Sequence, residues 1–168
     1  MNKYFRLLYT LLFSRFRSKV EMLGVCETPF RCYFNDLDVL SHMNNGVYFS
    51  LLDLGRVDFM IRAGVKGALD KNGWYPVVTA ETMKFRRSIN LFQKFKVQTQ
   101  ILGWNEKAFI VEQKFVARGD VVASAIIMAR FLKVTGGTVT PAEIMAAVDF
   151  KSPSPKIPDN VQAWIDSL

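Results

Sequence analysis

The feature that most constrains the fold of this chain is one long apolar helix followed by four strand-like segments. From residue 44 or 45 to residue 63, apolar residues recur at spacings of three and four and cover most of the helix. The later segments, rich in β-branched and aromatic residues, span residues 77–86, 92–102, 108–117 and 121–134. A helix that is apolar on so many sides needs cover on most of them, and one antiparallel sheet wrapped around it would provide that cover. We therefore expect an α+β domain.

The remaining segments complete the order of elements. A strand is expected over residues 27–34, directly before the helix, and Gly64 is expected to end the helix. Turns are expected at residues 103–106 and 118–120, and short helical segments at residues 65–73, after Thr140, and at 160–168. The later strands are then a β-meander with an exposed final edge. This order is that of the hot-dog architecture, with an N-terminal segment, a hot-dog domain and a C-terminal helical extension over residues 1–22, 23–135 and 136–168.

The charge of the chain is concentrated at its start. The formal net charge is +7, but the first twenty residues carry five cations and no acid, which leaves only +2 for the rest. The rest contains no DNA- or RNA-binding fingerprint, so a nucleic-acid partner is not expected. Half of the residues are hydrophobic, which also excludes a disordered chain.

The basic N-terminal segment contains a mostly apolar run over residues 7–13. A helix needs about 20 apolar residues to span a bilayer, so this run is too short to cross one. One interpretation is a helix that packs on the body of the protein. The other is an interfacial helix that makes peripheral contact with an anionic membrane through residues 1–19, and the clustered charge favours it. On this second interpretation, removing residues 1–19 would leave folding and turnover intact.

The two cysteines indicate neither a metal site nor a disulfide. Cys26 and Cys32 are six residues apart and would lie roughly 20 Å from each other on a strand, too far to bridge. No CxxC pair or Cys/His cluster exists, so no structural zinc is expected. Unpaired thiols fit a reducing compartment, which favours a cytoplasmic protein.

A polar motif lies between the first strand and the long helix. It includes the only histidine of the chain, and its polar residues are Asp36, Asp38, Ser41, His42, Asn44 and Asn45. The first turn of a helix offers free N–H groups and the positive end of a dipole, which stabilise a developing oxyanion and keep a nearby carboxylate ionised. The motif therefore has the groups needed to polarise a carbonyl and attack it.

The pattern Phe34-x-Asp36-x-Asp38-x-x-Ser41-His42-x-Asn44-Asn45-x-x-Tyr48, with Arg56 further on, resembles the 4-hydroxybenzoyl-CoA thioesterase branch of the hot-dog superfamily. The Leu-Ser-His-Met-Asn-Asn variant and the later Leu102-Gly103-Trp104 turn look closest to the "thioesterase superfamily member six" type. The resemblance implies an acyl-CoA thioesterase that needs no cofactor or metal and forms a homodimer or homotetramer, with its active site at the dimer interface.

The same resemblance implies roles for individual residues. Asp38 is the catalytic carboxylate, which either attacks the thioester or deprotonates a water. The amide near Asn45 polarises the thioester carbonyl. Asp36 holds the loop by accepting backbone hydrogen bonds, and Arg56 belongs to the structural motif. Ser41 departs from the family pattern, which usually has glycine there.

Several of these positions allow a second interpretation. His42 either orients substrate or braces the loop, and Asn44 either orients water or caps the helix. Tyr48 either binds substrate or belongs to the core. Arg86 and Arg87 either meet the phosphates of coenzyme A or are an exposed pair at a strand end. Asp53 is a second carboxylate on the helix that could act in catalysis, and it is also placed to pair with Arg56.

Other classes of protein fit the motif less well. The Asp36-x-Asp38 spacing fails the EF-hand pattern at its fifth and twelfth positions, Leu40 and Val47. A haloacid-dehalogenase phosphatase would need alternating βα units rather than a meander. The remaining alternative is a non-catalytic hot-dog protein that binds acyl chains or associates with a membrane. For an enzyme, the abundance of Phe, Met and Leu favours a medium or long fatty acyl group over an aromatic one.

Overall fold

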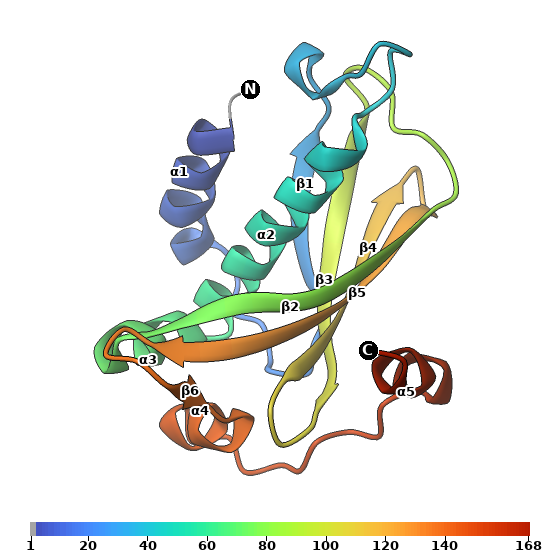
Figure 1. The fold of residues 1–168 in the computed structure, drawn as a ribbon. Coiled ribbons are helices and arrows are strands. Elements are labelled where there is room, and N and C mark those ends of the chain that lie inside the picture. Colours follow the sequence, from blue (N-terminus) through green and yellow to red (C-terminus); the bar gives the residue numbers. More distant parts are fainter. Residues whose placement is uncertain (1–2) are drawn as a thin grey trace.

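A sheet curls around one long helix in the computed structural model, which describes residues 3–168 (Figure 1). The helices are α1 (Lys3–Phe13), α2 (Asn45–Arg62), α3 (Val65–Asn72), α4 (Pro141–Ala147) and α5 (Asp159–Asp166), with short 3-10 turns η1 (Ser14–Phe16) and η2 (Phe34–Asp36). The strands are β1 (Cys26–Arg31), β2 (Trp74–Phe85), β3 (Lys94–Trp104), β4 (Phe109–Ala117), β5 (Asp120–Lys133) and β6 (Thr138–Val139). The expected long helix and strands are all present, with small shifts at their ends. The first two residues of the N-terminal segment lie outside the described part.

The strands pair antiparallel in the order β1-β3-β4-β5-β2, and β6 adds to β5. The expectation of an exposed final strand is therefore wrong, because β5 is interior and the exposed edge is β2. Residues 86–93 carry the chain across the sheet from β2 to β3, and Ile89 anchors this crossover by accepting the Met43 amide at 2.9 Å. The composition of a strand does not specify its neighbour, so the sequence pattern could not distinguish a crossover from a hairpin.

Helix α2 packs closely against the sheet that surrounds it. Leu51 and Leu52 are buried there together with Phe115 of β4. At Gly55 the helix comes so near the sheet that an added Cβ would lie 2.9 Å from Gln113 Nε2, so only glycine fits without displacing its neighbours. The helix ends as expected, because Gly64 adopts a left-handed conformation with a φ of 77°. This packing fixes the start of α2, where the polar motif lies.

Helix α1 packs against α2 rather than standing free. Arg6 is 4% exposed and donates to Asp36 Oδ2 at 2.5 Å and to the Arg31 carbonyl at 3.1 Å. Arg17 donates to Asp58 Oδ2 at 2.8 Å and to the Glu27 carbonyl at 2.7 Å. Removing residues 1–19 would take these partners from two buried carboxylates, which argues against the expectation that such a deletion leaves folding intact.

The C-terminal extension is tied to β3. The Trp104 amide donates to Ser154 Oγ at 2.7 Å, and the Trp104 ring meets that of Phe150 with centroids 6.2 Å apart. The proline-rich spacer therefore follows the end of the sheet before α5 begins. Within residues 3–168, no helix combines the length and the apolar character that crossing a bilayer requires.

Candidate active site

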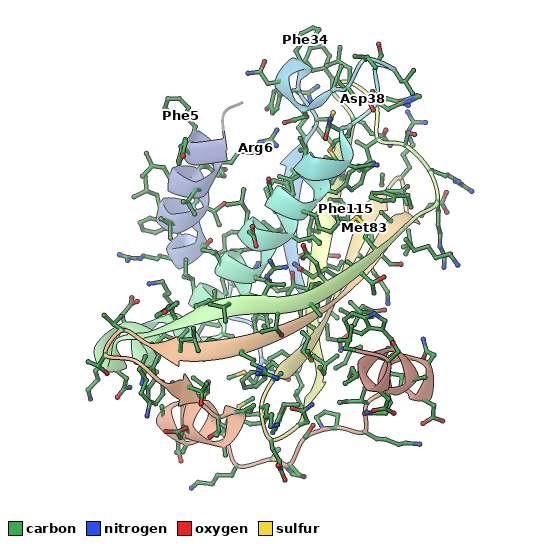
Figure 2. The ribbon with its side chains drawn as sticks, viewed as in Figure 1. Phe5, Arg6, Phe34, Asp38, Met83 and Phe115 are labelled. Atoms are coloured by element: carbon green, nitrogen blue, oxygen red, sulfur yellow. The ribbon has the colours of Figure 1, made fainter. Side chains whose placement is uncertain are left out.

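The loop between β1 and α2 is organised around Asp38 (Figure 2). The Asp38 amide donates to the His42 carbonyl at 2.8 Å, and Asp38 Oδ1 accepts the amides of Leu40 at 2.8 Å and His42 at 3.3 Å. Ser41, inside this turn, has a φ of 61°, a conformation that glycine adopts without strain. Among the described residues, none hydrogen-bonds to Asp38 Oδ2. One oxygen of this half-buried carboxylate therefore shapes the loop, and the other is available to a substrate or a water.

The start of α2 presents the backbone amide of Asn45. Asn44 is the N-cap, and its Oδ1 accepts the Gly46 amide at 2.8 Å, while its carbonyl accepts the Val47 amide at 2.9 Å. Asn44 therefore makes the capping contact that its second interpretation expected. In the part of the chain that the structure describes, the Asn45 amide has no acceptor. It is an orphan donor of the first helical turn, placed to receive an anionic or polarised oxygen.

Asp36 is a brace beneath this loop. Its Oδ2 accepts the Tyr33 amide at 2.8 Å and the Arg6 guanidinium at 2.5 Å, and its carbonyl accepts the Asn44 amide at 2.8 Å. Asp36 is thus buried, and its Oδ2 is held by a cation and a backbone amide, in the manner expected of a structural aspartate. The sequence did not indicate Arg6 as its partner, because the two are thirty residues apart and Arg6 is one of five cations in the N-terminal segment.

His42 joins the loop to the crossover through its backbone. It forms an antiparallel bridge with Asn90, and its side chain is exposed. Within residues 3–168, the imidazole has no hydrogen-bond partner. The ring is therefore at the surface of the loop that holds Asp38.

The structure places Tyr48 in the core, as its second interpretation expected. Its ring packs edge-on against Phe85 at 5.1 Å and Phe115 at 4.8 Å between centroids. Burial raises the pKa of the Tyr48 hydroxyl, against the smaller lowering effect of a hydrogen bond with the Ile89 backbone. A ring enclosed in this way supports the start of α2 from beneath.

Arg86 and Arg87 lie at the end of β2 nearest the start of α2. Both amides share the Val122 carbonyl, at 2.9 and 3.1 Å. Arg87 pairs with Asp120 at 2.6 Å, whereas the Arg86 guanidinium has no partner among the described residues. Of the two arginines expected to meet phosphates, Arg86 is the one whose charge is uncompensated.

A second polar cluster lies further along α2. Arg56 pairs with Asp53, as their spacing predicted, and also donates to Gln113 Oε1 at 2.7 Å. The buried Gln113 in turn donates to the Leu52 carbonyl at 3.0 Å and to Thr99 Oγ1 at 2.8 Å. Burial raises the pKa of Glu81 on β2, partly offset by the Arg56 charge. Gln113 is a functional candidate that sequence reasoning missed, since it appeared only as one member of an alternating strand.

This cluster borders an apolar cavity of about 480 Å³. Asp53 and Arg56 form its polar side, and Val57 and Met60 continue along the same face of α2. Its other walls come from β2, β3, β4, β5 and α4, and they are almost entirely apolar; they include Val77, Ile101, Phe109, Phe131, Ile144 and Met145. The cavity is therefore suited to a hydrocarbon group.

The candidate site has two parts of different chemistry. The loop and the start of α2 contain a carboxylate oxygen, an amide and an imidazole that have no hydrogen-bond partner among the described residues, while the cavity is lined by apolar side chains. Within residues 3–168, no three His, Cys, Asp or Glu side chains gather as metal ligands would. This combination can activate a carbonyl carbon that is attached to an apolar chain.

Comparison with known proteins identifies a family for this chain. The family model of the thioesterase-like superfamily matches residues 32–165. Protein THEM6 of Xenopus laevis is 36% identical over 131 residues, which are 78% of this chain and 62% of that protein. The chain therefore spans less than two thirds of the length of this relative.

Solved structures share the fold at low sequence identity. The YbaW probable thioesterase of Escherichia coli superposes with a TM-score of 0.69 at 22% identity, over 74% of this chain and 97% of that one. The protein SAV2348 of Staphylococcus aureus, solved in complex with CoA, gives a TM-score of 0.68 at 13% identity, over 86% of this chain and 96% of that one. These neighbours confirm the hot-dog fold expected from the sequence.

Proposed function

Because this chain belongs to the thioesterase-like superfamily, we propose that it hydrolyses acyl-CoA thioesters, with a preference for aliphatic acyl groups. The observation that carries this proposal is the free Oδ2 of Asp38 in the loop that leads to the unpaired amide of Asn45. A carboxylate and an oxyanion donor at one helix start are the two groups that thioester cleavage needs. His42 and Asn44 belong to the same loop and would orient the substrate or the attacking water.

The proposed reaction begins with the thioester carbonyl oxygen at the Asn45 amide. In one route, Asp38 Oδ2 attacks the carbonyl carbon and the C–S bond breaks, which releases the CoA thiolate and leaves a mixed anhydride that water hydrolyses. In the other, Asp38 accepts a proton from water, the resulting hydroxide attacks the carbon, and the thiolate leaves with that proton. Both routes end in a free acid and CoA.

The acyl chain would run along the uncovered face of α2 into the apolar cavity. Asn45 and Asp53 are eight residues apart, or about 12 Å along the helix. A medium or long fatty chain would cover this distance and then fill the cavity of about 480 Å³. Arg86, whose charge is uncompensated, is our candidate for the CoA phosphates. The complex of SAV2348 with CoA supports a CoA thioester as the substrate class.

The decisive experiment is turnover of acyl-CoAs of increasing chain length, followed by thiol release. The variant Val57→Phe narrows the cavity from its helix side and should shift the preference to shorter chains. Ile61→Phe, on the same helix but outside the cavity lining, is its matched control. Inactivity toward every aliphatic and aromatic acyl-CoA, combined with tight binding of one of them, would replace this proposal with the non-catalytic acyl-binding alternative.

We also propose a homodimer or homotetramer that acts in the cytoplasm with peripheral contact to an anionic membrane through residues 1–19. The exposed edge strand β2 supports such an assembly, because it offers unpaired backbone groups to a second copy. Cys26 and Cys32 are free and buried, which suits a reducing compartment.

A further inference from the structure

Helix α1 has its apolar face on the outside. The inward positions are polar and buried, at Arg6, Thr10 and Ser14, four residues apart. The outward positions are large and apolar, from Phe5 at 65% exposed to Phe16 at 86% exposed, and between them lie Leu8, Tyr9, Leu12 and Phe13. Figure 2 shows Phe5 on the outer side of α1 and Arg6 on the side toward the body. An ordinary surface helix has the opposite arrangement, so this exposed stripe needs an occupant.

Cations surround this stripe. Arg15 and Lys19 are exposed beyond the end of α1. On the sheet beside α1, Arg31 of β1 stands directly opposite Lys94 of β3, and directly opposed residues share one face of a sheet. Arg31 contacts the carbonyl and ring of Phe92, and Lys94 has no anionic partner among the described residues. Two like charges so close are unfavourable unless an anion joins them.

A cleft of about 760 Å³ connects the stripe to these cations. Tyr9, Phe13 and Phe16 line it from the N-terminal segment, and Arg31 and Lys94 line it from the sheet. Of the described residues that line it, none is acidic. The cleft thus joins an apolar wall to an uncompensated cationic rim, which is the pattern of a site for an anionic amphiphile.

We propose that α1 and this cleft together dock on an anionic phospholipid bilayer, with the stripe among the acyl chains and a lipid headgroup at Arg31 and Lys94. This deepens the peripheral membrane contact proposed above and extends it to residues outside the N-terminal segment. A bilayer fits better than a second copy of the chain, because two copies meeting at this face would bring their cations together. The Arg6–Asp36 and Arg17–Asp58 pairs hold the helix in place, so the docking face exists before it meets the lipid.

Vesicle co-sedimentation of the full chain tests the apolar stripe of α1. Wild-type protein should bind vesicles of phosphatidylcholine mixed with phosphatidylserine. The variant L8E/L12E, at two exposed positions, should bind at least about tenfold more weakly, because each leucine loses its apolar burial. The control Val134→Glu, an exposed apolar residue far from α1 in sequence, should bind as wild type does.

A second pair of variants tests the cationic part of the docking face. R31Q/K94Q should lose about fivefold in binding per cation on phosphatidylserine vesicles and little on pure phosphatidylcholine. K151Q/K156Q is its control, because both lysines are exposed on the C-terminal spacer. Failure of the wild type to sediment with phosphatidylserine vesicles would overturn the proposal, as would an L8E/L12E variant that keeps vesicle binding but changes oligomeric state.

Turnover of a soluble short-chain acyl-CoA should be unchanged in L8E/L12E. A failure of membrane docking is therefore distinguishable from a failure of the proposed hydrolysis.

Discussion

Two aspartates of the same loop have opposite surroundings. Asp36 is buried, and its carboxylate is held by Arg6 and the Tyr33 amide. Asp38 is half-buried, and only its Oδ1 is engaged, by amides of its own turn. A carboxylate whose two oxygens have different neighbours can support the loop and still act on a substrate. The two residues therefore differ in burial and in charged partner, and we expect a structural role for Asp36 and a catalytic role for Asp38.

We expect Asp38→Asn to lower turnover by roughly 10²–10⁴ with little change in substrate affinity. The substitution preserves the shape of the side chain but removes its charge and its basic oxygen. Asp36→Asn should instead lower the melting temperature, and its activity loss should follow unfolding. Turnover and thermal melts of both variants, measured side by side, check this. If Asp38→Asn keeps near wild-type turnover, the mechanism is wrong and Asp53 is the next carboxylate to test.

At the scale of elements, α1 supports the loop that holds Asp38. Arg6 reaches from α1 to Asp36, and Asp36 ties the loop to Asn44 through its carbonyl. Both members of the Arg6–Asp36 pair are almost fully buried. Breaking such a pair leaves a buried charge without its counter-ion, which is far more costly than losing a surface ion pair.

The variant Arg6→Gln should therefore destabilise the protein by about 3–5 kcal/mol. Arg15→Gln, an exposed arginine in the same segment, should change stability by no more than about 0.5 kcal/mol. Urea denaturation of the two variants measures the difference. Equal midpoints for both would show that α1 is not needed to hold the loop.

At the scale of the whole molecule, the two sheet edges differ. The edge at β1 is covered, because Arg17 and Arg6 engage the Glu27 and Arg31 carbonyls. The edge at β2 runs for 12 residues and exposes Tyr75, Val78 and Phe85. A long apolar edge without cover invites pairing with another strand. The molecule thus has one edge available for self-association.

We expect Val78→Lys to convert the proposed oligomer into monomers, because it adds a charge to the β2 edge. Val25→Lys, at a similarly exposed valine before β1, should leave the oligomeric state unchanged. Light scattering at micromolar concentration measures both. A monomeric wild type, or a Val78→Lys variant that still associates, would contradict this use of the edge.

Local signals in the sequence determined most of the elements. The apolar periodicity of α2, the left-handed Gly64 at its end, and the capping box of Thr140 with Glu143 each specify structure within a few residues. The motif residues likewise predicted a helix start beside two carboxylates. In the structure Asn44 is the N-cap, and Asp36 accepts a backbone hydrogen bond that holds the loop. Contacts of this kind depend on neighbours along the chain, so their residue types are enough.

Only the tertiary structure decided how these elements meet. The crossover that makes β2 an edge, the Arg6–Asp36 pair and the enclosure of Tyr48 all join residues distant in sequence. The sequence also does not determine which face of α1 packs on the rest of the protein. Its periodicity shows that the two faces differ, but not which one is buried. The buried carboxylates of Asp36 and Asp58 pair with Arg6 and Arg17, and these pairs orient the polar face of the N-terminal segment inward. Pairing a buried carboxylate outweighed burying a few more apolar side chains of α1, since an uncompensated buried charge costs more free energy than an exposed leucine or phenylalanine.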